Sequence, residues 1–289
     1  MLRLSDIHIR DPFVLPVPEE SGYYMYGTIG ASCWGGPGGG FDGYFSRDLE
    51  NWDGPFNVFP PAPDFWGKIN HWAPEVHRYQ GRFYMLASFK ADGVCRGTQI
   101  LAADSPRGPF TPLTAGPVTP RDWECLDGTL FVDVTGKPWI VFVHEWVQVH
   151  DGEIQAMALT PDLKQPAGPP SLLFRASEAP WAHKEPQQRD FVTDGPFVYR
   201  CEDGELLMLW SSFGAEGYAQ GIARSSSGRI VGPWTQTEKP LFGRDGGHGM
   251  IFRAFDGQLY LTLHQPNGAP NERPKFIKVA ERGNDIVLT

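Results

Sequence analysis

A glycine followed by a run of aromatic and aliphatic residues occurs five times along the chain. A second run rich in β-branched and aromatic residues precedes each of these glycines. Short apolar runs on both sides of a turn glycine are typical of two antiparallel β-strands joined by a tight turn. The five turn glycines are Gly22, Gly81, Gly136, Gly204 and Gly257.

A third recurring element follows each hairpin and is rich in Ser, Asp, Gly and Pro. It predicts the turn from a third strand to an outer strand, where proline is tolerated because an edge strand need not donate every ladder hydrogen bond. The units recur at intervals of roughly 50 to 70 residues, which predicts radial repetition. We therefore expect an all-β fold, a five-bladed β-propeller, in which residues 1–289 form a single domain. The third elements lie at 45–52, 103–110, 159–163, 224–228 and, in degenerate form, 279–283.

The residues that begin the first strand of each unit are candidates for the propeller axis. Aligning the five units without gaps selects Asp11, Trp72, Asp127, Asp194 and His248, and nearly every following residue is small. We expect these side chains to meet at the axial mouth and to form the active site there. Three clustered carboxylates repel one another, which spreads their pKa values. Acid–base catalysis needs such a spread, because one group must be ionised while another is protonated.

Each axial residue also has a simpler interpretation. Asp11 precedes Pro12, and aspartate before proline often caps a turn. The Asp-Gly pairs at Asp127 and Asp194 are common in turns, although the alignment of three aspartates favours a functional role. Trp72 is either a core residue or a surface that stacks on a sugar ring. His248 is either a buried, hydrogen-bonded histidine or a ligand of a central ion, bound directly or through water.

Charge and composition narrow the class of partner. The formal net charge is −9 and no cluster of Lys or Arg stands out, which argues against a nucleic-acid or anionic membrane surface. No apolar stretch is long enough for a transmembrane helix. These features agree with a neutral partner such as a carbohydrate. The four cysteines lack metal-site spacing and the N-terminus lacks a signal-peptide core, so we expect a cytoplasmic protein as the sequence stands, or a periplasmic or secreted one if a signal peptide has been removed.

The order of the motifs resembles glycoside hydrolase family 43, the five-bladed propeller arabinofuranosidases, xylosidases and arabinanases. The resemblance implies that Asp11 is the general base that activates water and that Asp127 orients the acid and tunes its pKa. It also implies that His248 binds a central ion, often calcium, through water, while the chemistry itself needs no cofactor. The matching segments span nearly the whole chain and are 10–13, 72–75, 126–131, 194–197 and 247–249.

The fourth motif departs from the family pattern. The family usually has glutamate as the general acid where this chain has Asp194. Aspartate is one methylene shorter, and a misplacement of about 1 Å can cost about a hundredfold in rate. Three explanations are open: Asp194 is still the acid, another carboxylic acid has taken the role, or activity is lost. The best substitute is Glu145, at the end of the second strand of the third unit, unless it is an ordinary strand-end glutamate.

We predict an inverting, exo-acting glycosidase that cleaves α-L-arabinofuranosyl or related pentose or furanose linkages in plant-type polysaccharides or oligosaccharides. The alternatives are a non-catalytic carbohydrate-binding propeller and a β-xylosidase or β-galactofuranosidase. The long stretches 29–43 and 264–273 favour a pocket, and so exo action. For substrate binding we expect an aromatic platform of Trp34, Trp72 and Trp146. Glu75 is expected either to position substrate or to hold neighbouring loops.

Overall fold

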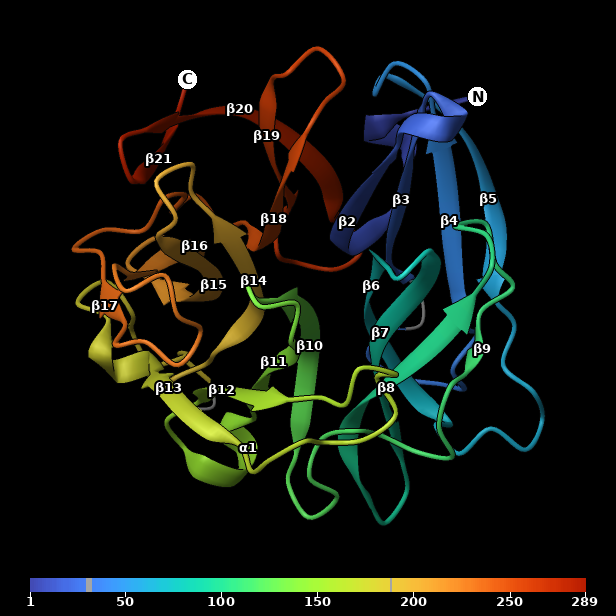
Figure 1. The fold of residues 1–289 in the computed structure, drawn as a ribbon, viewed down its shortest axis with the longest axis horizontal. Coiled ribbons are helices and arrows are strands. Elements are labelled where there is room, and N and C mark those ends of the chain that lie inside the picture. The colour runs from blue at the N-terminus through green and yellow to red at the C-terminus, as the bar shows by residue number, and fades with distance from the viewer. Residues whose placement is uncertain (30–32, 188) are drawn as a thin grey trace.

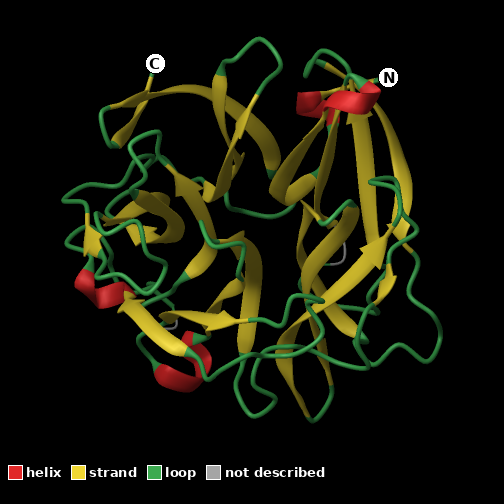
Figure 2. Cartoon of the chain, in the orientation of Figure 1, coloured by secondary structure: helices red, strands yellow, loops and turns green. Residues whose placement is uncertain are grey.

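The computed structural model of the chain describes residues 1–29, 33–187 and 189–289. Five antiparallel sheets surround a central axis (Figure 1), so the predicted all-β, five-bladed β-propeller is confirmed. The helices are short segments between strands (Figure 2). In the described part of the chain, no helix is long and apolar enough to cross a membrane. The helical segments are η1 (Leu4–Asp6), η2 (Pro18–Glu20), α1 (Trp146–Val149) and η4 (Ala176–Glu178).

Each blade is a meander that starts with the strand nearest the axis and ends at the outer edge. The recurring turns predicted from the sequence join the third strand of a blade to its outer strand, as expected. The blades are β2 (Ile9–Val17), β3 (Gly22–Ile29), β4 (Phe41–Ser46) and β5 (Asn51–Phe59); β6 (Ile69–Tyr79), β7 (Arg82–Ala91), β8 (Val94–Ala103) and β9 (Thr111–Pro112); β10 (Cys125–Val132), β11 (Pro138–His144), β12 (Glu153–Ala158) and β13 (Ser171–Arg175); β14 (Asp194–Arg200), β15 (Leu206–Gly214), β16 (Gly217–Ser225) and β17 (Thr235–Gln236); and β18 (Gly247–Arg253), β19 (Leu259–Gln265), β20 (Arg273–Arg282) and β21 (Asp285–Leu288).

The core lies between neighbouring blades. One buried cluster contains Tyr24, Phe41 and Phe59, and a second contains Phe174 and Trp210. Because each sheet is covered on both faces, its inner strands read as nearly continuous apolar runs rather than as alternating ones. Burying one such side chain contributes about 1.5–3 kcal/mol. The aromatic runs in the sequence are therefore explained by blade-to-blade packing.

The ring closes where the N-terminal residues meet blade five. The short β1 (Leu2–Arg3) pairs with β5 inside blade one, so closure depends on other contacts. Arg273 Nε donates to Ser5 O at 3.0 Å. Arg10 Nη1 donates to Glu272 Oε1 at 2.7 Å, in a buried ion pair. These contacts fix the segment between β19 and β20 against blade one, beside the axial mouth.

A β-bulge interrupts the innermost strand of every blade. In blade one, Asp11 and Pro12 both lie opposite Gly27, and the other four blades repeat this pattern. A bulge bends its strand and redirects its side chains, and aspartate and histidine tolerate left-handed backbone better than most residues. The first bulge residues all have positive φ, and they are Asp11 (53°), Ala73 (46°), Asp127 (52°), Gly195 (47°) and His248 (50°).

The ungapped alignment of the five units is therefore wrong by one residue in blades two and four. Ala73 and Gly195 hold the bulge position there, whereas Trp72 and Asp194 come one residue earlier, in register with Ser88 and Ser211. The physical reason is that the bulge is defined by backbone pairing and φ. An alignment based on side-chain size does not detect either property.

Candidate active site

The axial mouth leads into a cavity of about 240 Å³. This volume lies below the range of about 300–1,000 Å³ that is usual for sites enclosing drug-sized ligands, so the cavity suits a short stretch of a sugar chain. All five residues predicted for the axis line it, despite the shift of register in two blades. They are Asp11, Trp72, Asp127, Asp194 and His248.

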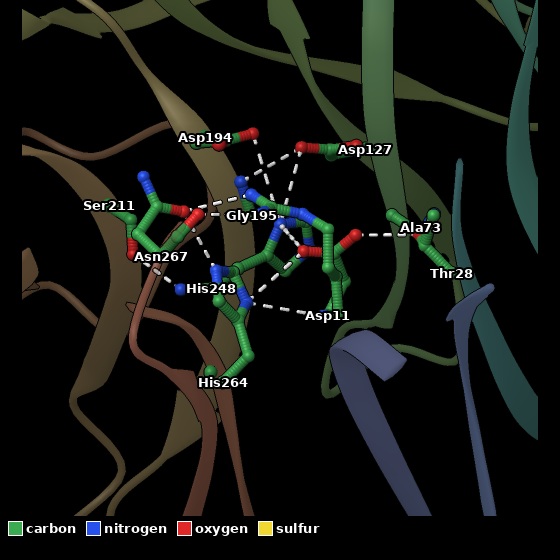
Figure 3. Close-up of polar contacts among 12 residues, drawn as sticks. Asp11, Thr28, Ala73, Asp127, Asp194, Gly195, Ser211, His248, His264 and Asn267 are labelled. Atoms are coloured by element: carbon green, nitrogen blue, oxygen red, sulfur yellow. Dashed lines mark hydrogen bonds and ion pairs between the residues drawn. The ribbon is translucent and has the colours of Figure 1, made fainter. Parts of the chain in front are cut away.

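His248 lies among the three aspartates (Figure 3). Its Nδ1 is 3.2 Å from Asp11 Oδ1, 3.7 Å from Asp127 Oδ2 and 3.8 Å from Asp194 Oδ1. The side chains of Asp11 and Asp127 are almost fully buried, and that of Asp194 is 22% exposed. The structure thus brings together three carboxylates that come from three different blades.

Asp11 is held as a carboxylate. Thr28 Oγ1 donates to its Oδ2 at 2.6 Å. Burial alone raises the pKa of Asp11, but nearby His248 and Arg10 and the Thr28 hydroxyl outweigh it, so the pKa lies below its ordinary value. An ionised carboxylate at neutral pH can accept a proton from water, which is what a general base must do.

The pKa of Asp194 is shifted in the opposite direction. Burial, then the charge of Asp127 and a hydrogen bond shared with it, raise the pKa of Asp194 well above its ordinary value. Tyr218 donates its hydroxyl to Asp194 Oδ2 at 2.6 Å. A carboxyl group that keeps its proton at neutral pH is suited to general acid catalysis.

Asp127 lies between these two extremes. Burial, opposed by the hydrogen bond with Asp194 and helped by the charge of Asp11, raises the pKa of Asp127 to about 6. Gly195 N–H donates to its Oδ2 at 3.1 Å. The pKa values of the three carboxyl groups are therefore spread apart, as expected for clustered carboxylates that repel one another.

Sequence reasoning missed several residues that support this arrangement. His264 Nδ1 accepts the backbone N–H of Asp11 at 3.2 Å, and its Nε2 bonds Asn267 Oδ1 at 2.9 Å. Burial and nearby Arg10 lower the pKa of His264 to about 4, so its ring is neutral and its Nδ1 can accept. A signal for these residues lies in the second strand of each blade. In four blades, the second-strand residue that pairs with the residue just before the bulge is polar. These residues are Thr28, Ser88, Ser211 and His264.

Aromatic side chains form one wall of the cavity. The Trp72 ring is covered by the Arg96 guanidinium at 3.8 Å and meets the edge of Trp34 at 5.6 Å. Trp34 is 62% exposed and lies over Arg10. Trp146, at the start of α1, lines the cavity as well. The three tryptophans proposed as a platform thus all lie at the mouth.

The two glutamates singled out from the sequence have different surroundings. Glu145 lines the cavity, is buried and accepts a hydrogen bond from Arg96 Nε at 3.1 Å. Burial raises the pKa of Glu145, while Arg96 opposes this shift by favouring the carboxylate. Glu75 is not among the residues that line the cavity. Its carboxylate bonds His77 Nε2 at 2.9 Å, inside blade two.

One group of described residues could offer ligands to a metal ion. The ligand atoms of Asp127, Asp194 and His248 lie within 4.8 Å of one another. Calcium takes about six to eight oxygen ligands, but this group offers two carboxyl groups and a nitrogen. Three donors fill only part of a calcium shell, so the calcium at the axis, expected on His248 through water, stays a prediction and no step is assigned to it.

Comparison with solved structures gives similar proteins of the same architecture. The endo-arabinase from Bacteroides thetaiotaomicron VPI-5482 is 42% identical, with a TM-score of 0.92 and 98% of each chain covered. The endo-1,4-β-xylanase from the same organism is 24% identical, with a TM-score of 0.80, covering 98% of this chain and 94% of that chain. The α-L-arabinofuranosidase from Lactobacillus brevis is 18% identical, with a TM-score of 0.76 and coverage of 99% and 97%. The last two share the fold alone.

No curated protein matches the sequence. The family model for glycosyl hydrolases family 43 matches residues 5–281, nearly the whole chain. The chain belongs to glycosyl hydrolases family 43 and is a glycosidase.

Proposed function

We propose that the chain is an inverting, exo-acting glycosidase that hydrolyses α-L-arabinofuranosyl linkages. The observation that carries the proposal is that one cavity holds two carboxyl groups whose pKa values are shifted in opposite directions. The pKa of Asp11 is lowered by His248 and Arg10 against the effect of burial. The pKa of Asp194 is raised by burial and by Asp127. A sugar-binding propeller without catalysis has no need for such a pair.

In the proposed reaction Asp11 removes a proton from water as the oxygen attacks the anomeric carbon. Asp194 transfers its proton to the leaving glycosidic oxygen as the carbon–oxygen bond breaks. One proton is gained by Asp11 and one is lost by Asp194, and exchange with solvent restores both. Asp127 favours the protonated form of Asp194 until the transfer, because its negative charge opposes a second one nearby.

The proposed stereochemistry depends on the separation of the two working groups. Asp11 Oδ1 and Asp194 Oδ1 lie 3.2 Å and 3.8 Å from the same His248 nitrogen. The two oxygens are therefore at most about 7 Å apart, a limit that includes the lower end of the range of about 6.5–9.5 Å found in inverting enzymes and also the roughly 5–5.5 Å of retaining enzymes. NMR of the first-formed anomer tests this point directly, since release of the retained anomer would refute inversion.

The choice of arabinose is supported by the comparisons and by the cavity wall. The 42%-identical neighbour is described as an endo-arabinase. Trp34, Trp72 and Trp146 offer apolar faces with polar edges, which suit the faces of sugar rings. Exo action is supported by the small cavity and by the segment between β19 and β20, whose Asn267 lines the mouth.

Endo action is the second candidate, because it is the activity named for that neighbour. Digestion of a linear 1,5-linked arabino-oligosaccharide series separates the two modes. Exo action predicts one short product from the start of the reaction, whereas endo action predicts a mixture of intermediate lengths.

A panel of aryl glycosides tests the sugar. We expect turnover of the α-L-arabinofuranoside to exceed that of the β-D-xyloside and the β-D-galactofuranoside. Asp11→Asn should remove activity on every substrate, and Asp194→Asn only on substrates with poor leaving groups. Preference for either of the other two sugars would overturn the assignment of substrate. If Glu145→Gln, rather than Asp194→Asn, gave the leaving-group effect, the assignment of the acid would be wrong.

A further inference from the structure

Tyr218 on β16 contacts the proposed acid from within the same blade. Its hydroxyl donates to Asp194 Oδ2 at 2.6 Å, and only 2% of the residue is exposed. Its ring stacks on His264 with centroids 5.6 Å apart and meets the edge of Phe213 at 5.7 Å. Because neighbouring rings hold it on two sides, the hydroxyl has a fixed place relative to Asp194.

The neighbouring blade leaves room for this ring. A Cβ atom at Gly247, the first residue of β18, would lie 2.6 Å from Tyr218 Cε1. Carbon atoms in contact are normally about 3.5–4.0 Å apart, so any side chain at Gly247 would displace the ring. The position of the Tyr218 hydroxyl therefore depends on a glycine in blade five.

The hydrogen bond also determines where the acid carries its proton. A neutral carboxyl group carries one proton on one of its two oxygens. Because Oδ2 accepts the Tyr218 hydrogen bond, it binds this proton less readily than Oδ1 does. The proton therefore belongs on Oδ1, which lies 3.8 Å from His248 Nδ1. Without the phenol, the terminal torsion of aspartate is broad and roughly two-fold, so the two oxygens could exchange places.

We propose that Tyr218 is a positioning residue that holds the short acid Asp194 with its proton on Oδ1. This inference rests on the proposed role of Asp194 as general acid. When Oδ1–H gives its proton to the leaving oxygen, Asp194 becomes a carboxylate and the Tyr218 bond becomes charge-assisted. Charge-assisted hydrogen bonds are about twice as strong as neutral ones. Tyr218 thus stabilises the state in which the proton has left, and most of all for leaving groups that need full protonation.

The test is Tyr218→Phe, which keeps the ring and removes the hydroxyl. For an arabino-oligosaccharide we expect kcat to fall about 10- to 100-fold with little change in KM, since general acid catalysis contributes a factor of about 10²–10⁴ to the rate. For an activated aryl arabinoside, which needs little protonation, we expect kcat to fall less than about threefold. Tyr199→Phe is the matched control, because it also removes a hydroxyl that donates to a carboxylate, at 2.8 Å to Glu281 Oε2. It should change neither rate.

A double variant keeps the test decisive. In an Asp194→Ala background, Tyr218→Phe should have no further effect, because two residues that act as one unit are not additive. Equal losses on both substrates, no loss, or an undiminished effect in the Asp194→Ala background would each overturn the proposal. Thermal unfolding of each variant shows whether the fold is intact.

The outcome separates this inference from the proposed function. If another glycoside is the true substrate, the same comparison of poor and activated leaving groups is made with that sugar. If Asp194→Ala spares substrates with poor leaving groups, the assignment of the acid fails whatever Tyr218→Phe does. If Asp194→Ala shows the selective loss and Tyr218→Phe does not, only the positioning role fails.

Discussion

Gly195 N–H in blade four donates a hydrogen bond to Asp127 Oδ2 in blade three, at 3.1 Å. At the other four blade interfaces, the N–H of the first bulge residue goes to a second-strand side chain of the preceding blade. Blade three has Val143 at that position, paired with Leu126, and a valine side chain cannot accept a hydrogen bond. The Asp127 carboxylate therefore accepts this hydrogen bond instead, and the bond fixes Asp127 to the backbone next to Asp194. The other four bonds are Asp11 to His264, Ala73 to Thr28, Asp127 to Ser88 and His248 to Ser211.

Val143→Thr should weaken the hydrogen bond from Gly195 N–H to Asp127, because it places a competing hydroxyl acceptor where the other blades have a polar side chain. The Gly195 bond lowers the pKa of Asp127 against the larger effect of burial, so losing it should raise that pKa above about 6. The acid limb of kcat/KM against pH should then move to higher pH. Val141→Thr is the matched control, the same change two residues earlier on β11. Identical profiles for the two variants would refute the role of Val143.

The pH profile of the unmodified enzyme should have its acid limb near pH 6. Asp127 must be ionised to accept the hydrogen bond that orients Asp194, and burial raises the pKa of Asp127 to about 6. The Asp11 limb lies lower, because nearby His248 and Arg10 lower the pKa of Asp11 despite its burial. The alkaline limb reports Asp194, whose pKa is raised by burial and by Asp127. Activity that holds down to pH 4 would show that Asp11, rather than Asp127, sets the acid limb.

The parts of the site that could be predicted are those carried by one residue and its chain neighbours. Asp11, Asp127 and His248 could be found because each lies at the start of a recurring sequence pattern. The exact register in blades two and four could not, because it depends on the pairing of Trp72 and Asp194 with the next strand. Backbone pairing of this kind cannot be identified from a single sequence, because it does not depend on one residue type or spacing.

The supporting residues were harder to predict because their roles depend on another part of the fold. Tyr218 lies on the third strand of its blade and reaches Asp194 on the first. His264 comes from blade five and contacts Asp11 in blade one. Neither belongs to a motif with fixed spacing. Once the blades are aligned by structure, a polar residue recurs at the second-strand position of His264 in three other blades, and this repeat is a usable signal.

Asp127→Asn should stabilise the fold while it impairs catalysis. Burial raises the pKa of folded Asp127 from 3.8 to about 6, so the folded state holds the proton more tightly than the unfolded chain does. The group therefore costs stability as pH rises from about 4 to 6, and at pH 7 the cost is about 3 kcal/mol. We expect Asp127→Asn to unfold at higher denaturant concentration than the unmodified protein at pH 7, with the gain vanishing below about pH 4.

Asp133→Asn provides the control for this measurement. Asp133 lies in an exposed turn of the same blade and accepts hydrogen bonds from Thr135 and Lys137. Despite some burial, these hydrogen bonds lower the pKa of Asp133, so its carboxylate contributes stability at neutral pH. Asp133→Asn should therefore not stabilise the protein at pH 7. An Asp127→Asn variant that is equally or less stable than the unmodified protein at pH 7 would contradict the assigned cost.

Arg10→Lys should change the length of the products. Arg10 donates to Asn267 O, Asn267 Oδ1 and Glu272 Oε1 at 2.7–2.8 Å, and so fixes the segment between β19 and β20 at the mouth. Lysine keeps the charge but lacks the planar fork needed for these bonds. If this segment closes one end of the cavity, loosening it should let longer chains bind across the mouth. We expect a larger share of intermediate-length products from linear arabino-oligosaccharides, measured by chromatography at low conversion. Arg253→Lys is the control, because its guanidinium bonds Gly257 O and lies outside the residues that line the cavity. A product pattern that Arg10→Lys leaves unchanged would show that another part of the mouth decides between exo and endo action.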